Sequence, residues 1–233
     1  MSVASMPPNS RPRRLIQSFV RREGRISDAQ RRALKEILPH FEIAADARAD
    51  FAAAFGRIAP VVLEIGFGNG DALLAAAREH PDTDFVGIEV HRPGAGRVCL
   101  ALAQNPLSNL RLVIADASEW LAHQVPDASL GEVRIFFPDP WPKKRHHKRR
   151  LIQPPFVATL RDKIVIGGLL RLATDWDNYA QQMLQVLSAT PGLRNESDDG
   201  FAPRFASRPQ TRFERRGELL GHHTWDLSFR RIA

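Results

Sequence analysis

The chain has 233 residues, of which 43% are hydrophobic and 25% charged, a composition typical of a globular protein with one large α/β domain and a short extension. Its single cysteine, Cys99, excludes a disulfide framework, no apolar run approaches the roughly 20 residues of a membrane span, and the N-terminus lacks the apolar core of a signal peptide, so we expect a cytoplasmic protein. The net charge is +7, but residues 1–32 and residues 143–150 each carry +6, so the remainder is mildly acidic.

The N-terminal part of the chain is predicted to lie outside the main domain. Residues 1–17 are rich in Pro, Ser and Arg, a composition typical of a disordered basic tail. Residues 18–56 are predicted to form a helical extension, in which Ser27-Asp28 caps a helix that ends near Pro39 and a second short helix covers 47–55. The main domain is expected to cover 57–233.

From residue 60 onward, short apolar strands alternate with helices. We predict strands over 61–65, 84–89, 110–114 and 132–137, a fifth that passes from 163–166 to 168–173 across a Gly-Gly turn, and final strands over 193–196 and 224–230. Predicted helices cover 71–80, 94–104, a short segment capped by Ser118, a segment that begins near Pro154-Pro155, and 177–187. This alternation implies βαβ crossovers, so we expect an α/β fold with a mostly parallel, seven-stranded sheet flanked by helices.

In such sheets ligands bind beyond the carboxyl ends of the strands. The conspicuous polar residues of this chain follow predicted strand ends: Glu64, Gly66, Glu89, Asp116, Asp139 and Asp175. Five strand ends that present such residues at one edge are a stronger signal than any single motif. We therefore expect a ligand site at this edge.

A glycine-rich turn, Glu64-Ile-Gly-Phe-Gly-Asn-Gly-Asp71, follows the first strand of this pattern. Glycines let the backbone turn sharply and let a ligand approach closely. A carboxylate at Glu89 is placed to accept hydrogen bonds from ribose hydroxyls, and Asp116 can reach an adenine amino group. A dinucleotide and S-adenosylmethionine both fit this pattern. The carboxylates of Glu64 and Asp71 would repel a pyrophosphate and suit a sulfonium and an ammonium, so the charges favour S-adenosylmethionine.

The segment after the fourth strand combines a rigid turn with dense positive charge. In Phe137-Pro-Asp-Pro-Trp141 the prolines fix the carboxylate of Asp139, and Trp141 either stacks on a base or caps the core. Six of the next eight residues, 143–150, are Lys or Arg. Such runs are usually solvated faces, but this one lies beside a predicted ligand site. It therefore indicates a surface for a phosphate backbone, and less strongly for a membrane.

Several motifs resemble known families. Glu-x-Gly-x-Gly-x-Gly, with an acid at the end of the second strand, resembles the class I methyltransferase family over about residues 60–175, which implies a Rossmann-like fold. The segment 137–150, Thr174-Asp-Trp-x-x-Tyr179 and the C-terminal motifs of 211–217 and 221–227 resemble the bacterial tRNA (guanine-N7)-methyltransferase family, and the resemblance covers about residues 18–230. Arg212 stands where that family more often has Lys.

This resemblance implies methyl transfer from S-adenosylmethionine to N7 of guanine 46 in the variable loop of tRNA. It implies a cofactor site made of Glu64, Gly66, Gly68, Glu89, Asp116 and Asp139, with Asp139 also the catalytic residue. It implies substrate contacts from Lys143, Asp175, Thr211, Arg212, Phe213 and Glu214, and RNA contacts from Arg145, His146, His147, Lys148, Arg149 and Arg150. We expect neither a bound metal, because the paired histidines lack ligand spacing, nor an obligate protein partner.

The chemistry of guanine N7 agrees with these residues. N7 has a free lone pair and no proton, so no strong general base is required, and the sequence shows no Ser/His/Asp or Cys/His constellation. Asp139 and Asp175 are placed to stabilise the positive charge that methylation creates.

Three other functions remain open: a methyltransferase for rRNA, DNA or protein, a non-catalytic RNA-binding module, and a dehydrogenase. The two basic segments disfavour a protein substrate. The carboxylates at the strand ends disfavour a module without a cofactor, and the glycine spacing disfavours a dehydrogenase.

Overall fold

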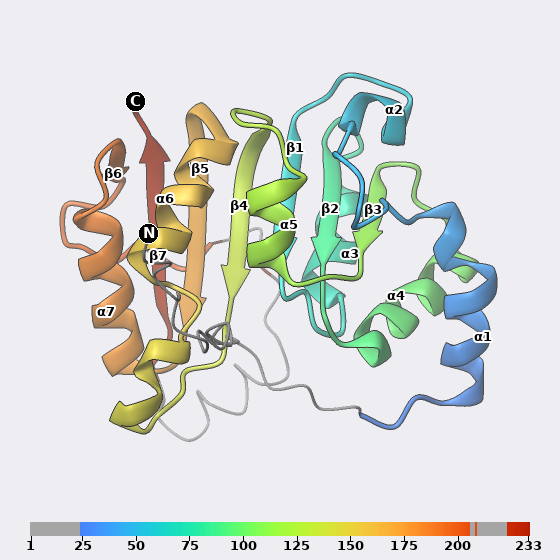
Figure 1. Ribbon diagram of the computed structural model, residues 1–233, viewed down its shortest axis with the longest axis horizontal. Coiled ribbons are helices and arrows are strands. Elements are labelled where there is room, and N and C mark those ends of the chain that lie inside the picture. Colours follow the sequence, from blue (N-terminus) through green and yellow to red (C-terminus); the bar gives the residue numbers. More distant parts are fainter. Residues whose placement is uncertain (1–23, 206–207, 209–222) are drawn as a thin grey trace, which may run out of the picture.

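The computed structural model describes residues 24–205, 208 and 223–233. In these ranges the helices are α1 (Asp28–Glu36), α2 (Phe51–Phe55), α3 (Asp71–Glu79), α4 (Arg92–Gln104), α5 (Ala117–His123), α6 (Pro154–Lys163) and α7 (Asp177–Ser188), with 3-10 helices η1 (Leu38–His40) and η2 (Lys144–Arg149). The strands are β1 (Val61–Ile65), β2 (Asp84–Ile88), β3 (Leu110–Val113), β4 (Leu130–Phe136), β5 (Ile164–Thr174), β6 (Leu193–Asn195) and β7 (Trp225–Arg231) (Figure 1).

Within the described ranges, seven strands form one sheet in the order β3-β2-β1-β4-β5-β7-β6 (Figure 1). The strands from β3 to β5 are parallel, and β7 is antiparallel to both β5 and β6. The expected Rossmann-like, mostly parallel sheet is therefore confirmed. The chain order reverses between β1 and β4, so the connections from these neighbouring strands diverge and open a crevice beyond their carboxyl ends.

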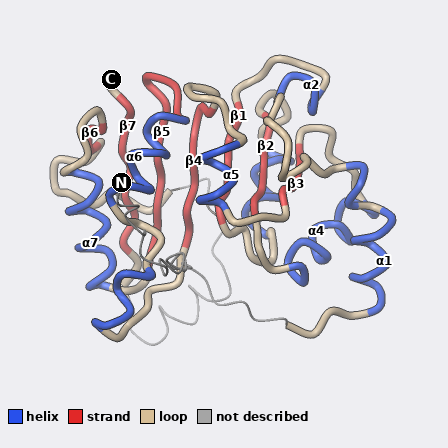
Figure 2. The backbone as a smooth tube through the Cα atoms, viewed as in Figure 1, coloured by secondary structure: helices blue, strands red, loops and turns tan. Residues whose placement is uncertain are grey.

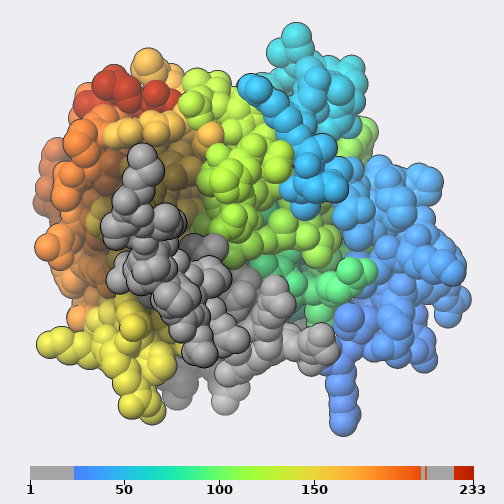
Figure 3. All heavy atoms as spheres, viewed as in Figure 1, coloured from blue at the N-terminus to red at the C-terminus, as the bar shows by residue number. Residues whose placement is uncertain are grey.

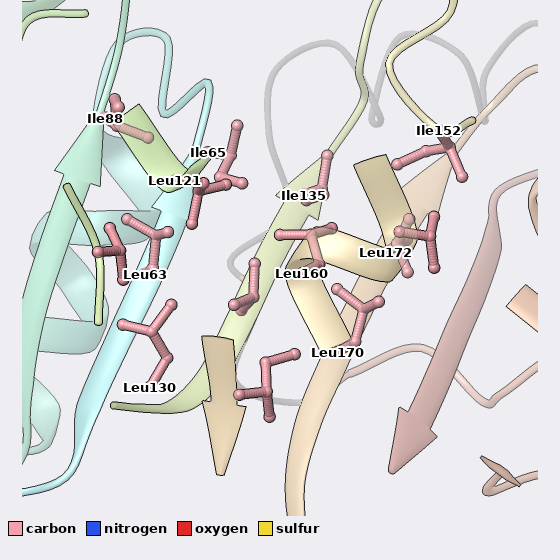
Figure 4. Packing of buried hydrophobic residues seen from close by; sticks show 14 of the residues in the cluster. Leu63, Ile65, Ile88, Leu121, Leu130, Ile135, Ile152, Leu160, Leu170 and Leu172 are labelled. Atoms are coloured by element: carbon pink, nitrogen blue, oxygen red, sulfur yellow. The ribbon is translucent and has the colours of Figure 1, made fainter. Parts of the chain in front are cut away.

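Helices cover both faces of the sheet (Figure 2). Side chains of α5, α6 and α7 pack on one face, and side chains of α1, α3 and α4 form a second core on the other. Leu63, Leu160 and Leu172 belong to the first core, which Figure 4 shows close up. Val62 belongs to the second core, because successive strand residues point to opposite faces. Strands buried on both faces need nearly continuous apolar runs, and β1 is such a run with the exception of Glu64.

The N-terminal extension packs against the edge of the sheet. Ser27 and Gln30 form a capping box at the start of α1. The Gln30 side chain also donates to the carbonyl of Pro93 in α4 at 3.0 Å, and its Cβ lies close to Gly96, where an added methyl group would meet it at 2.9 Å. Further along the chain, the backbone N–H of Ile43 donates to the carbonyl of Leu112 in β3. The extension therefore supports α4 and covers the β3 edge.

Three local predictions were wrong. The second helix begins at Phe51, not at residue 47, because the Asp50 side chain accepts a hydrogen bond from the N–H of Ala53 and caps it there. Asp116, not Ser118, caps α5, and its carboxylate accepts from the N–H of Ser118 itself. The Gly-Gly pair does not divide the fifth strand. β5 continues through Gly167 and Gly168, and the register with β4 shifts instead.

Among the described residues, no helix has the length and apolar character that crossing a membrane requires.

Candidate active site

The glycine-rich turn after β1 leaves open space beside its backbone. Gly66 and Gly68 have φ angles of 72° and 55°, a left-handed conformation that other residues adopt at a cost. A Cβ added at either position would meet nothing within 4 Å, so the backbone here is directly accessible. On the other side of the turn, the carbonyl of Gly68 lies against Gly94 of α4, where an added Cβ would come within 2.1 Å of it. The turn is therefore packed from behind and open in front.

Glu89 stabilises this turn from the end of β2. It is 6% exposed, and its Oε2 accepts a hydrogen bond from the N–H of Gly68 at 3.0 Å. Its Oε1 accepts from the backbone N–H groups of Val90 and His91 at 2.8 and 3.0 Å. Three backbone donors fix the carboxylate in one orientation. The lone pairs that these bonds leave over are suited to ribose hydroxyls, the role expected from the sequence.

A cavity joins the ends of β1, β2, β4 and the start of α5. Four of the predicted site residues, Gly66, Glu89, Asp116 and Asp139, line it together. Its apolar lining is contributed by Ile65, Ile88, Val90, Ala115, Ala117, Ile135, Phe136, Phe137, Pro138 and Leu151. A mainly apolar cavity that carboxylates also line fits a flat heterocycle joined to a polyhydroxylated, positively charged group.

Glu64 lies on the opposite face of β1 from this cavity. Its neighbours Ile65 and Gly66 line the cavity, whereas Glu64 is 4% exposed and faces Arg134 across the β1–β4 pairing. Its Oε2 has no hydrogen-bond partner among the described residues. Burial raises the pKa of Glu64 to about 7, against the lowering effect of Arg134. A buried carboxylate oxygen without a donor is suited to an incoming ammonium group.

The turn that carries Asp139 is strained. Phe137 and Trp141, which flank it, have φ angles of 53° and 44°, unusual for bulky residues. Such outliers persist only where surrounding contacts fix them. The N–H of Phe137 donates to the carbonyl of Ala173 in β5, and the guanidinium of Arg150 donates to the carbonyl of Pro140 at 2.8 Å. The turn holds Asp139 exposed to solvent at the cavity mouth.

The basic run forms η2, which belongs to a lobe that projects from the surface (Figure 3). Asp139 and Leu151, on either side of this run in the chain, both line the cavity. Lys143, Lys144, Arg145 and Lys148 are exposed, and His146, His147 and Arg149 are half-buried. The ring of Trp141 stacks with His146 at 5.8 Å between centroids, and the Arg149 guanidinium lies 4.3 Å from its centroid. Partial burial, together with the nearby arginines and lysines, lowers the pKa of His146.

Arg150 differs from the rest of the run, because it is only 2% exposed. Asp175, half-buried, follows the last residue of β5, the strand adjacent to β4, so Asp139 and Asp175 follow neighbouring strand ends. The predicted substrate residues Thr211, Arg212, Phe213 and Glu214 lie outside the described residues, as does His222.

Two contacts of a single arginine, Arg208, were not predicted from the sequence. Arg208, 1% exposed, forms an ion pair with buried Asp226 of β7 at 3.2 Å. Its guanidinium also lies 5.1 Å from the ring centroid of Phe137 at the strained turn. Asp226 stands in the C-terminal motif and was the available signal, but its partner lies 18 positions earlier in a polar segment without periodicity. Among the described residues, no cluster of His, Cys, Asp or Glu is arranged to hold a metal ion.

The strand order, the crevice between β1 and β4 and the carboxylates that line the cavity are those of a class I S-adenosylmethionine-dependent methyltransferase. Solved structures share this fold. The 16S rRNA methyltransferase KamB aligns with a TM-score of 0.55 and 15% identity, covering 91% of this chain and 97% of that one. The antibiotic-resistance methyltransferase Kmr also aligns with a TM-score of 0.55, with 18% identity, covering 80% of this chain and 93% of that one.

Sequence relatives identify the family. The family model described as "Putative methyltransferase" matches residues 58–227. A tRNA (guanine-N(7)-)-methyltransferase of Pseudomonas paraeruginosa is 51% identical over 225 residues, 96% of this chain and 92% of that protein. One of Edwardsiella ictaluri is 51% identical over 232 residues, 98% and 97% of the two chains. The chain belongs to the tRNA (guanine-N(7)-)-methyltransferase family.

Proposed function

We propose that this protein transfers the methyl group of S-adenosylmethionine to N7 of guanine in tRNA, at position 46 of the variable loop. The proposal rests mainly on one observation: the rigid turn that carries Asp139 opens into the same cavity that Glu89 and Asp116 line. In addition, the chain is 51% identical to tRNA (guanine-N(7)-)-methyltransferases over nearly its whole length. We assign the reaction to the cytoplasm as part of the same proposal, because its substrate is tRNA.

The cofactor fits the residues around the cavity. Glu89 would accept from the ribose hydroxyls, and Asp116 from the adenine amino group, while the apolar lining would enclose the adenine ring. The open backbone at Gly66 and Gly68 leaves room for the amino acid part. Glu64 lies outside the cavity, on the other face of β1, but it immediately precedes this turn, and its carboxylate oxygen without a described donor would attract the ammonium group. When bound, S-adenosylmethionine supplies an electrophilic methyl group on a sulfonium.

The protein's own contribution to the reaction is positioning and charge stabilisation. The N7 lone pair attacks directly, so no side chain has to remove a proton. Asp139 and Asp175 would stabilise the positive charge that develops on the purine ring, or accept from guanine N1 and N2. Lys143 and the segment Thr211–Glu214 would contact the substrate. Alignment of N7 with the methyl group would supply most of the rate enhancement.

The charge of the basic helix η2 is evidence for a polyanionic substrate. Its exposed Lys144, Arg145 and Lys148 project beside the cavity mouth without a carboxylate partner in the described ion pairs. Contacts of this kind with phosphates release counterions and make affinity strongly dependent on salt. RNA binding through this surface would bring a variable-loop guanine to the Asp139 turn.

The test uses the purified protein, an unmodified tRNA transcript and methyl-labelled S-adenosylmethionine, followed by digestion and separation of the nucleosides. We expect the label in 7-methylguanosine. The matched control is the same transcript with adenine in place of guanine 46, which should accept no label. Label in another nucleoside, or 7-methylguanosine formed equally in the control transcript, would contradict the proposed base or the proposed position.

A further inference from the structure

Arg150 is the buried member of a run whose other cations reach the surface. Its Nε donates to the carbonyl of Pro140 at 2.8 Å. One terminal nitrogen donates to Oε1 of Gln182 at 2.6 Å and the other to Oδ1 of Asn178 at 3.0 Å. The guanidinium also lies 4.7 Å from the ring centroid of Tyr179. These contacts use the donors on all three guanidinium nitrogens and one face of the group, which leaves little of it for a phosphate.

The acceptors around Arg150 are neutral. Pro140 offers a carbonyl and Asn178 and Gln182 offer side-chain amides, and no ion pair of Arg150 occurs among the described residues. Burial lowers the pKa of Arg150, and Tyr179 opposes that effect. A buried cation without a carboxylate partner is unfavourable unless its hydrogen bonds are complete. The hydrogen bonds of Arg150 join the Asp139 turn to α7, and they compensate for the burial of its charge.

The following residues reinforce the same connection. The N–H of Ile152 donates to the hydroxyl of Tyr179 at 3.1 Å, and the Gln182 amide donates to the carbonyl of Ile152 at 3.1 Å. The stretch from Arg150 to Ile152 is thus bonded to three side chains of α7, those of Asn178, Tyr179 and Gln182. Only Trp176, the N-cap residue, separates Asp175 from the first turn of α7, and Pro140 directly follows Asp139. Arg150 therefore spans the two segments that carry the two site carboxylates.

The backbone strain of the Asp139 turn makes it depend on the contact with Arg150. The turn between Phe137 and Trp141 has two bulky residues in the left-handed region and needs outside contacts to persist. Arg150 supplies a charge-assisted hydrogen bond to the carbonyl of Pro140, within that turn.

We propose that Arg150 is a positioning residue, which fixes the Asp139 turn against α7 and so sets the placement of Asp139 relative to Asp175, and that it does not contact tRNA phosphates. This assignment rests on the proposed function, because it concerns the carboxylates of that reaction.

The test compares Arg150→Met with Lys148→Met, which removes an exposed cation from the same run. For Arg150→Met we expect kcat to fall about 10- to 100-fold, since small misplacements of reacting groups have effects of this size. The Kd for tRNA, and the slope of log Kd against log salt concentration, should equal those of the wild-type protein. For Lys148→Met the slope should become shallower by about 0.9, as for one lost phosphate contact, and the KM for tRNA should rise.

A second pair of variants carries no change of charge. Gln182→Met removes one of the two side-chain acceptors that α7 offers to Arg150, and we expect kcat to fall while the salt slope stays that of the wild-type protein. The control is Gln181→Met, an exposed neighbour on the same helix, which should leave kcat, KM and salt slope unchanged. Thermal unfolding of each variant separates loss of fold from loss of positioning. Should Arg150→Met not fold, Arg150→Lys replaces it, because Lys keeps the charge but cannot reproduce the planar set of hydrogen bonds.

Two results would overturn the assignment. One is a shallower salt slope for Arg150→Met that matches Lys148→Met, which would make Arg150 a phosphate contact. The other is an unchanged kcat in folded Arg150→Met or Gln182→Met. Failure of the proposed function has a different signature: the wild-type protein itself would transfer no methyl group to tRNA, and the positioning role would fall with it.

Discussion

The backbone N–H of Gly68 donates to the Glu89 carboxylate at 3.0 Å, which joins the turn after β1 to the end of β2. This bond connects two parts of the proposed cofactor site that are 21 residues apart in the chain. The same carboxylate accepts from Val90 and His91, so one side chain sets the conformation of both segments. Glu89 therefore has two roles in the proposed site, as a ligand for ribose hydroxyls and as a support for the open turn.

Replacement of Glu89 by Gln should weaken cofactor binding more than loss of one ligand contact would. The amide keeps the size but loses the charge and one acceptor, so at least one of the three backbone donors loses its partner. Hydrogen bonds to charged groups contribute about 1.5–3 kcal/mol, so we expect the Kd for S-adenosylmethionine to rise about 10- to 100-fold. Titration calorimetry measures it, with Glu79→Gln on the exposed end of α3 as the control. Equal affinities of the wild-type protein and Glu89→Gln would exclude both roles.

Replacement of Asp139 by Asn should separate catalysis from cofactor binding. Asp139 is exposed at the cavity mouth, whereas Glu89 and Asp116 lie deeper, so most cofactor contacts survive the change. The amide cannot stabilise the positive charge on the methylated purine. Loss of one such stabilising group lowers kcat by about 10²- to 10³-fold in other enzymes, and we expect a reduction of this order. Single-turnover methylation at saturating cofactor and tRNA measures it. Unchanged turnover would remove Asp139 from the proposed chemistry.

Much of the fold followed from local sequence signals. Apolar runs and Gly or Pro punctuation predicted the seven strands to within a few residues, because a sheet buried on both faces needs these patterns. The errors arose where two local signals competed. Asp116 and Ser118 are both good caps, and only the structure shows that Asp116 has the extended backbone of an N-cap. The Gly-Gly pair reads as a turn, yet β5 continues through it with a shifted register.

The candidate site was predictable where it follows strand ends. Glu89, Asp116 and Asp139 come together at one cavity because parallel strands end at the same edge. The role of Arg150 could not be read in the same way. It ends a run of cations that look alike in sequence, and its burial depends on α7, which lies about 30 residues further along the chain. Long-range side-chain contacts of this kind leave no periodic trace.

The stability of the cofactor-free protein should depend on pH through Glu64. Its pKa is about 7 in the folded protein instead of 4.5, so between these values the folded state keeps a proton that the unfolded chain has lost. The contribution of Glu64 to the free energy of unfolding is therefore complete below pH 4.5 and is lost as the pH rises through 7. At about 1.4 kcal/mol per pKa unit, the loss is at most about 3 kcal/mol.

Comparison with Glu64→Gln isolates this contribution. The amide cannot ionise, so the difference in unfolding free energy between wild type and variant should grow with pH from about 5 to 7.5. Urea unfolding at several pH values measures it. The control is Glu36→Gln, at an exposed carboxyl on α1, whose profile should run parallel to that of the wild-type protein. Parallel profiles for Glu64→Gln as well would show that Glu64 is ionised in the folded state at neutral pH.

The ion pair between Arg208 and Asp226 should contribute more to stability than the surface pairs do. Both side chains are almost fully buried, at 1% and 2% exposure, so Asp226→Asn would remove a negative charge that faces a buried guanidinium. Breaking a buried pair in this way costs about 3–5 kcal/mol. The matched control is Asp28→Asn, which breaks an exposed pair with Arg31 at 2.7 Å and should cost at most about 1 kcal/mol. Because Thr211 follows Arg208 by only three positions, we also expect Asp226→Asn to raise the KM for tRNA. Urea unfolding measures the change in stability, and steady-state kinetics measure the KM for tRNA. Equal destabilisation by Asp226→Asn and Asp28→Asn would show that the buried ion pair contributes no more to stability than the exposed one.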